Sequence, residues 1–191
     1  MLSKRYLWIG FVIMVLAQLW VPSQMIMTSE RTIEQGEVFK FKTVPVDPVD
    51  PFRGKYIRLR YEVESKRYQL PAGVTVELHQ EVYAILDHKD GYASIIDIQL
   101  SLPHDHQAYM PVTVQRRASN FVYIDVPIDK YFMEESLAQP AEDAVRALRT
   151  DTTAAVYGMV SVLAGHAVLQ DVYINEETIA AYVRRQQANE Q

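Results

Sequence analysis

The most prominent pattern in this chain is a long apolar run near the N-terminus. A basic pair, Lys4 and Arg5, precedes residues 6–21, where Gln18 is the only strongly polar side chain. With its extension to residue 27, the run reaches the ~20 residues that a helix needs to cross a bilayer. The pattern therefore predicts a transmembrane anchor over residues 6–27.

Two interpretations of this run compete, an uncleaved anchor and a cleaved signal peptide. A signal peptide ends in a small-x-small cleavage site, which Ala17-Gln18-Leu19 does not supply. We therefore favour an anchor, with the basic end at residues 1–5 in the cytoplasm, because Lys and Arg stay on that side. Residues 28–36 are then expected to form a polar juxtamembrane connector, and residues 37–191 a single domain outside the cytoplasm.

Beyond the anchor, apolar and polar residues alternate with the period of β-strands. Residues 37–46 and 55–63 are predicted strands on this basis. Three hairpins follow, since apolar runs flank turn-forming residues, most clearly Asp90-Gly91. The predicted hairpins pair residues 78–86 with 92–100, 110–115 with 121–126, and 154–163 with 166–174.

Two short helices complete the expected fold. Residues 140–148 are predicted to be helical, with Pro140 in the first turn, where a missing N–H costs nothing. Asn175 is positioned to cap a second helix over residues 176–187. The predicted fold class is therefore mainly β, with antiparallel hairpins, one N-terminal transmembrane helix and one or two short helices. A partly closed barrel is one arrangement of these hairpins.

Composition narrows the chemistry that this chain can perform. A net charge of −5 gives no general attraction for nucleic acid, which we exclude as a partner. The chain has no cysteine, and this excludes disulfides, thiolate nucleophiles and every Cys-based metal site. It also has no glycine-rich phosphate loop, and we expect no cofactor.

A short motif carries a family resemblance. Gly54-Lys-Tyr-Ile-Arg-Leu-Arg-Tyr61 resembles the motif that names the bacterial GDYXXLXY family, with Lys55 in place of its aspartate. The preceding Pro45-Val-Asp-Pro-Val-Asp-Pro-Phe-Arg53 resembles the segment that leads into that motif. Tyr131-Phe-Met-Glu-Glu135, followed by Glu142, is similar to a later stretch of the family. The resemblance therefore covers most of the chain.

The resemblance implies a placement and no reaction. Members of this family look like envelope proteins that are anchored in the bacterial cytoplasmic membrane, and they look like accessory proteins of multi-pass membrane proteins. We therefore expect residues 6–27 to contact the lipid bilayer and the domain to lie in the periplasm or outside the cell. An integral multi-pass protein is the expected partner.

The motif has a structural and a functional interpretation. On a strand, Ile57, Leu59 and Tyr61 share one face and are expected in the core. Gly54 would let the chain turn out of the proline-rich loop, in which Asp47 and Asp50 are turn-forming residues. The functional alternative is an interaction surface at this loop, formed by the following residues: Asp47, Asp50, Arg53, Gly54, Lys55, Tyr56, Arg58, Leu59 and Tyr61. We favour the structural interpretation, because Gly, Asp and Pro usually mark turns.

Basic residues are concentrated around the motif. Eight basic residues and four acidic ones lie between residues 40 and 67. Such a segment near an anchor can meet anionic lipid head groups or an acidic partner. A solvated strand face is the simpler explanation, since exposed strands commonly carry Lys and Arg.

An enzymatic alternative rests on Ser23 and Lys66. Several landmarks resemble those of type I signal peptidases in order, and Ser23 would then be the nucleophile and Lys66 its base. A Ser–Lys dyad works when a desolvated lysine loses its proton and activates the serine. The match is short, and Ser23 is followed by Gln24 where the peptidases have methionine. We rank this hydrolase below a non-enzymatic role.

One metal hypothesis rests on His104 and His106, which could turn two imidazoles toward one ion. A zinc site needs three or four ligands, and the sequence names no third. We therefore favour a polar loop and predict no metal. The leading hypothesis from the sequence is a single-pass envelope protein that binds or supports a multi-pass membrane protein. The alternatives are the Ser–Lys hydrolase and a ligand-binding domain outside the cytoplasm.

Overall fold

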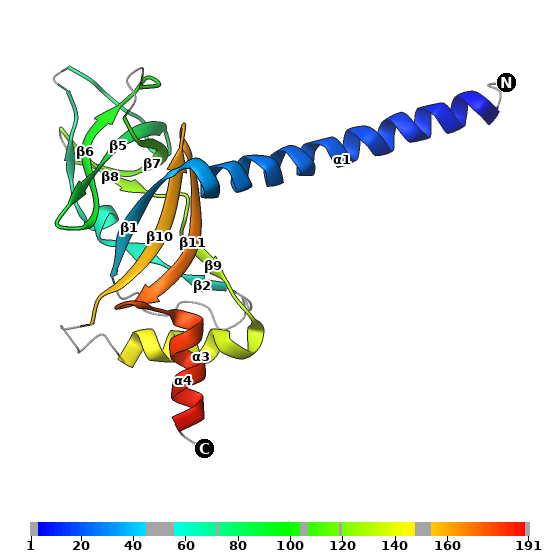
Figure 1. Cartoon of the computed structure of the whole chain (residues 1–191). Coiled ribbons are helices and arrows are strands. Elements are labelled where there is room, and N and C mark those ends of the chain that lie inside the picture. The colour runs from blue at the N-terminus through cyan, green and yellow to red at the C-terminus, as the bar shows by residue number, and fades with distance from the viewer. Residues whose placement is uncertain are drawn as a thin grey trace.

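The fold consists of a long N-terminal helix attached to a β-rich body (Figure 1). The computed structural model describes residues 4–44, 56–71, 73–103, 107–118, 120–147 and 154–189. Strands outweigh helices and build a nearly closed, barrel-like sheet, which confirms the predicted fold class. The helices α3 and α4 lie together at the end of the body away from the hairpins β5–β6 and β7–β8.

The N-terminal helix is longer than the apolar run alone. Helix α1 spans Lys4–Gln35, 32 residues, with Pro22 inside it. The predicted connector is therefore helical up to Gln35, and the backbone N–H of Gly36 closes the helix on the Thr32 carbonyl at 3.0 Å. The strand β1, Glu37–Val44, starts directly afterwards. Only Gly36 separates helix α1 from the sheet.

The three predicted hairpins are all present, and adjacent strands in each are antiparallel. The turn between β5 and β6 is tight: Asp90 and Gly91 both have positive φ, 53° and 81°, as a type I′ hairpin turn requires. The strands are β5 Glu81–Lys89 with β6 Tyr92–Gln99, β7 Tyr109–Ala118 with β8 Phe121–Asp125, and β10 Val156–Leu163 with β11 His166–Ile174.

Two five-stranded sheets form the barrel-like body. One has the order β12-β11-β10-β1-β3 and the other β4-β8-β7-β5-β6. The remaining strands are β3 Arg60–Tyr61, β4 Tyr68–Gln69 and β12 Glu177–Thr178. Strand β6 lies beside β1, but in the described part of the chain no strand pairing joins them, so the barrel stays open at this seam. A single core connects both sheets.

The predicted continuous strand over residues 55–63 is wrong. The chain forms β2 Tyr56–Arg58, leaves it at Leu59, forms β3, and then enters the short helix α2 Glu62–Ser65. Strand β2 pairs with β9, Lys130–Phe132, whereas β3 pairs with β1. The break therefore lies where the motif passes from one sheet to another.

The two predicted C-terminal helices are present, but each begins at a different residue from the predicted one. Helix α3 spans Glu135–Ala147, so Pro140 lies inside it rather than in its first turn. Helix α4 spans Ile179–Asn189, and Asn175 does not cap it. Instead, Asn175 occupies the turn after β11 with φ 57°, and its side-chain oxygen accepts the Ala155 N–H at 2.9 Å. Thr178 takes the capping role, since its hydroxyl accepts the Ala181 N–H at 3.3 Å.

Candidate functional site

The motif segment places its apolar side chains in the core, as the sequence predicts. Ile57, Leu59 and Tyr61 are buried, and Arg58 is exposed between them. The backbone of Tyr56 pairs with Phe132 in β9, and its side chain lies outside the described part of the structure. The other motif and loop residues, Asp47, Asp50, Arg53, Gly54 and Lys55, also lie outside the described residues.

Tyr61 is the residue around which the motif is packed. Its hydroxyl donates a hydrogen bond to the carbonyl of Ile128 at 2.9 Å, and its ring meets Phe41 edge to face. Burial raises the pKa of its phenol, so the hydroxyl stays a donor. Gly158 faces it so closely that an added Cβ would lie 3.1 Å from Tyr61 Oη. These contacts give Tyr61 a structural role.

A buried carboxyl group, that of Glu64, lies beside this tyrosine. Oε2 of Glu64 accepts the backbone N–H of Tyr61 at 2.8 Å, and Oε1 accepts the N–H of Val126 at 3.1 Å. The residue is only 5% exposed. Burial, with a smaller contribution from the nearby Asp125, raises the pKa of Glu64 to about 7, whereas the two backbone N–H groups oppose the shift. The sequence signal for Glu64 is its place three residues after Tyr61, which fits a glutamate at the start of a helix.

The motif is also tied to β9 and the segment before it. The N–H of Leu59 donates to the Asp129 carbonyl at 2.7 Å, and the exposed Arg58 pairs with the Asp129 carboxylate at 3.4 Å. Tyr131 then donates to Asp171 in β11 at 2.6 Å. The motif is therefore connected to the segment before β9, and β9 in turn is connected to β11.

The described basic residues around the motif contact several different groups. Arg58 pairs with Asp129, Lys66 pairs with Glu62, and the guanidinium of Arg67 lies 5.0 Å from the ring centroid of Phe121. Arg53 and Lys55 lie outside the described residues. Arg60 is exposed on β3, beside the end of β1. Lys40 and Lys42 lie on β1, where they face β10 and β6.

Ser23 and Lys66 each make a contact within their own segment. The Ser23 hydroxyl donates to the Leu19 carbonyl one turn earlier in α1 at 2.8 Å. Lys66 Nζ lies 2.8 Å from Glu62 Oε1, and its side chain is 52% exposed. A lysine that acts as a base must be desolvated, and Lys66 is not. Between these two residues, the structure shows none of the geometry of a dyad.

The metal hypothesis has no geometric support in the described residues. They contain no group of three or more His, Asp or Glu side chains that could hold an ion. His104 and His106 lie outside the described residues. His88 has another role, since its ring stacks on Phe39 with centroids 4.4 Å apart and its Nε2 lies 3.0 Å from Glu37 Oε1. It links β5 to the start of β1 across the open seam.

The outward face of β1 and β10 carries a cluster that sequence reasoning missed. Lys40 Nζ lies 5.2 Å from the ring centroid of Tyr157, and Lys42 Nζ 5.9 Å from that of Tyr92. Tyr157 stacks on Tyr173 with centroids 5.5 Å apart and meets Tyr92 edge to face at 6.1 Å. We call these five residues the lysine–tyrosine face. They come from four strands, and no local sequence pattern signals their convergence.

Helix α1 is long and apolar enough to cross a membrane. Among the described side chains of its most apolar 18-residue stretch, none is buried against the rest of the protein. Its last turns contact β10 and β11, and Thr32 is fully buried there. The helix thus has two parts, an exposed apolar part and a short part packed on the sheet.

Comparison with known proteins identifies a family for this chain. The family model described as GDYXXLXY protein matches residues 18–172. No curated protein and no solved structure matches the chain. The family match runs from the middle of α1 into β11 and thus includes the motif, the three hairpins and α3. The chain therefore belongs to the GDYXXLXY family.

Proposed function

We propose that this protein is a single-pass membrane protein of the cell envelope. Its β-rich domain lies outside the cytoplasm and binds or supports a multi-pass membrane protein. One observation carries the proposal: α1 exposes its apolar side chains over most of its length and continues without a linker into β1. An exposed apolar surface of this length is costly in water and is typical of contact with lipid or with other membrane helices.

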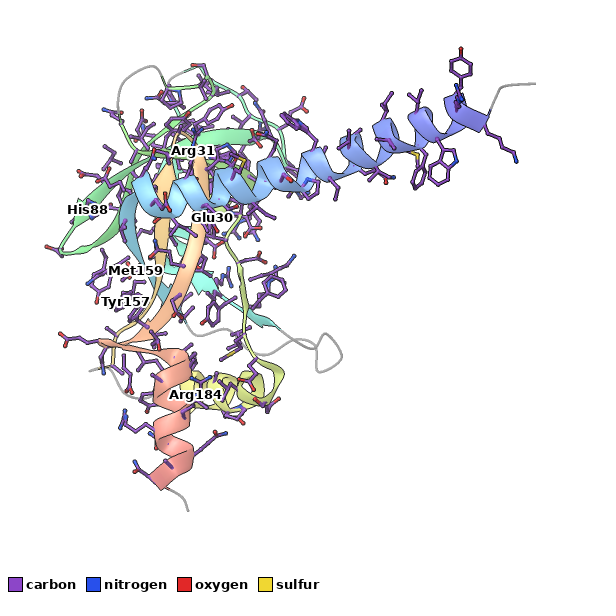
Figure 2. The ribbon with its side chains drawn as sticks, turned by 45° about the vertical axis from the view of Figure 1, so that its right-hand side comes forward. Glu30, Arg31, His88, Tyr157, Met159 and Arg184 are labelled. Carbon is purple, nitrogen blue, oxygen red and sulfur yellow. The ribbon has the colours of Figure 1, made fainter. Side chains whose placement is uncertain are left out.

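The length of α1 is consistent with this placement. The helix rises ~1.5 Å per residue, so the uncharged residues 6–29 extend for ~36 Å, enough for a hydrocarbon core of ~30 Å. Lys4 and Arg5 precede this stretch in the sequence. Glu30 and Arg31, which follow it, are labelled on α1 in Figure 2. Basic residues at the N-terminal end favour a cytoplasmic N-terminus. The β-rich body then lies next to the outer surface of the membrane.

The motif supports an accessory role rather than a reaction. Its described residues serve as core and as junctions between sheets, and Ser23 and Lys66 contact other partners. We infer that the motif positions the body relative to its anchor, and that the binding surface lies elsewhere on the body.

Affinity capture tests the proposal. The tagged, full-length protein is isolated from gently solubilised membranes, and the co-purifying chains are identified by mass spectrometry. We expect a specific multi-pass membrane protein with the native chain, and the same protein with the variants Ser23→Ala and Lys66→Ala. If no multi-pass protein is captured reproducibly, the accessory role is wrong. An unrelated single-pass protein carrying the same tag is the control for adventitious capture.

A further inference from the structure

We infer that the lysine–tyrosine face is the surface on which the body docks an acidic segment of its membrane partner, outside the bilayer. The inference rests on the proposed function and adds a location and a chemistry to it. It starts from the position of the face relative to α1.

The face continues the surface that α1 already covers. Val38 pairs with Ser161, and both point away from the core because the neighbouring Phe39 points into it. Ser161 is nevertheless fully buried, since the last turns of α1 cross β10 and β11 here. The next outward pair is Lys40 with Met159.

The rest of the face follows one step further along these strands. The outward pair after Lys40 and Met159 is Lys42 with Tyr157. Each step of two residues covers ~7 Å along a strand. Figure 2 shows Met159 and Tyr157 along β10, beyond the point where α1 crosses it. A protein packed against α1 in the membrane would therefore have its outer loops next to this face.

The charge of the face defines the partner. Among the described residues, neither Lys40 nor Lys42 forms an ion pair; each ammonium lies over a tyrosine ring. The nearby carboxylates already have donors: Glu37 contacts His88, and Asp171 accepts the hydroxyl of Tyr131. Two lysines thus remain available for carboxylates of a partner, on a protein whose net charge is −5.

Two other carboxylates lie near the lysine–tyrosine face and interact only weakly with its residues. Glu62, whose pKa is lowered mainly by its hydrogen bond to Lys66, receives a smaller electrostatic contribution from Lys42. Glu176 contributes a small part of the raised pKa of Tyr157, after burial and Tyr92. Neither carboxylate forms an ion pair with Lys40 or Lys42 among the described residues.

The tyrosines make this face suitable for binding. Tyrosine is enriched at the centres of protein interfaces, because it offers a large apolar ring and a polar tip with few rotatable bonds. Tyr157 itself is buried, with 6% of its surface exposed, and packs against Tyr92 and Tyr173. The half-buried rings of Tyr92 and Tyr173 are therefore the accessible aromatic part of the face, and their packing on Tyr157 leaves little side-chain freedom to be lost on docking. Long-range attraction by the lysines would then guide an acidic loop onto a preorganised aromatic surface.

Site-specific photocrosslinking in native membranes tests the inference. The photoreactive amino acid p-benzoylphenylalanine replaces Met159 in the full-length protein, and the crosslinked peptide is identified. We expect a crosslink to a segment of a multi-pass protein that is rich in Asp or Glu and lies outside the bilayer. The double variant Lys40→Glu/Lys42→Glu should lower its yield about tenfold or more, since like charges then oppose each other.

The matched control is Arg67→Glu/Arg116→Glu. It makes the same change in charge and also removes two cation–π contacts, but on β8 of the other sheet. Its crosslink yield should stay native. A rescue experiment excludes a folding defect. When the crosslinked acidic residues of the partner are replaced by Lys, the crosslink yield of the Lys40→Glu/Lys42→Glu variant should return, because opposite charges then face each other again. A misfolded variant would not be rescued in this way.

The outcomes separate the two proposals. Suppose that the native chain captures a multi-pass protein, but Lys40→Glu/Lys42→Glu leaves the crosslink yield unchanged. The docking face is then wrong, and the accessory role is still supported. The docking face is also wrong if the photoreactive residue at exposed Gln115 on β7 crosslinks the partner and the one at Met159 does not. Failure of the native chain to capture any multi-pass protein removes both proposals.

Discussion

Oε2 of Glu64 accepts the backbone N–H of Tyr61 at 2.8 Å, and this short contact holds the end of the motif against helix α2. The same carboxyl group reaches the Val126 N–H after β8, so one side chain connects the motif to the second sheet. Because the group is buried and lies near Asp125, its protonation is coupled to folding.

The first prediction concerns stability against pH. The folded-state pKa of Glu64 is about 7, above its ordinary value of 4.5, so the folded protein holds this proton more tightly than the unfolded chain. The stabilisation of the folded state by the protonated Glu64 is therefore fully present below about pH 4.5, and it is lost as the pH rises through about 7. A shift of this kind corresponds to on the order of 1–3 kcal/mol.

Thermal unfolding of the detergent-solubilised protein between pH 4.5 and 8 measures this effect. Glu64→Gln should flatten the dependence of the midpoint on pH over this range. Glu62→Gln is the matched control, because Glu62 is more exposed and its pKa is lowered by Lys66. An unchanged pH profile in Glu64→Gln would show that other groups carry the dependence.

The second prediction concerns the close approach of Gly158 to Tyr61. Gly158→Ala places a methyl group 3.0 Å from the end of the Leu169 side chain and 3.1 Å from Tyr61 Oη. Leu169 can rotate, but Tyr61 is held by its bond to Ile128, so we expect a loss of ~1–3 kcal/mol in unfolding free energy. Gly10→Ala, which meets open space in α1, is the control and should leave the stability of the body native.

The third prediction isolates the Tyr61 hydroxyl. Tyr61→Phe keeps the ring but leaves the buried carbonyl of Ile128 without its donor. Such a loss costs ~1–3 kcal/mol. Chemical denaturation of the full chain in detergent checks the size. Tyr123→Phe is a fair comparison, since that half-buried tyrosine packs under Arg116, and its midpoint should move little.

The fourth prediction concerns the enzymatic alternative. Ser23→Ala removes only a hydrogen bond within α1, and Lys66→Ala only an exposed ion pair worth ~0–1 kcal/mol. We expect both variants to complement a deletion strain as well as the native gene does. Loss of complementation in both, with normal protein levels, would revive the Ser–Lys hydrolase.

Local patterns were sufficient for part of this structure. The three hairpins were predictable because alternation and turn residues such as Asp90-Gly91 are encoded within a few positions of each other. The end of the motif strand was not, because the break at Leu59 depends on Asp129, which lies far along the chain. The start of α3 was also missed: Pro140 favours a first helical turn, but the helix begins five residues earlier, at Glu135.

Some of the candidate sites were likewise predictable from local sequence, and others were not. Ile57, Leu59 and Tyr61 were predictable as core from the period of a strand. The lysine–tyrosine face was not, since Tyr92 and Tyr157 meet only when two hairpins fold together. The loop hypotheses for Asp47, Asp50 and His104 fall on residues outside the described structure and stay predictions.

The most direct test of the central claim is the side of the membrane on which the body lies. The chain has no cysteine, so single cysteines at Ser3 and at exposed Ser136 in α3 can be labelled without background. We predict that a membrane-impermeant maleimide labels Ser136→Cys in intact spheroplasts, and Ser3→Cys only after the membrane is opened. Protection of both sites until lysis, or release of the protein from membranes by alkaline carbonate, would contradict an anchored domain outside the cytoplasm.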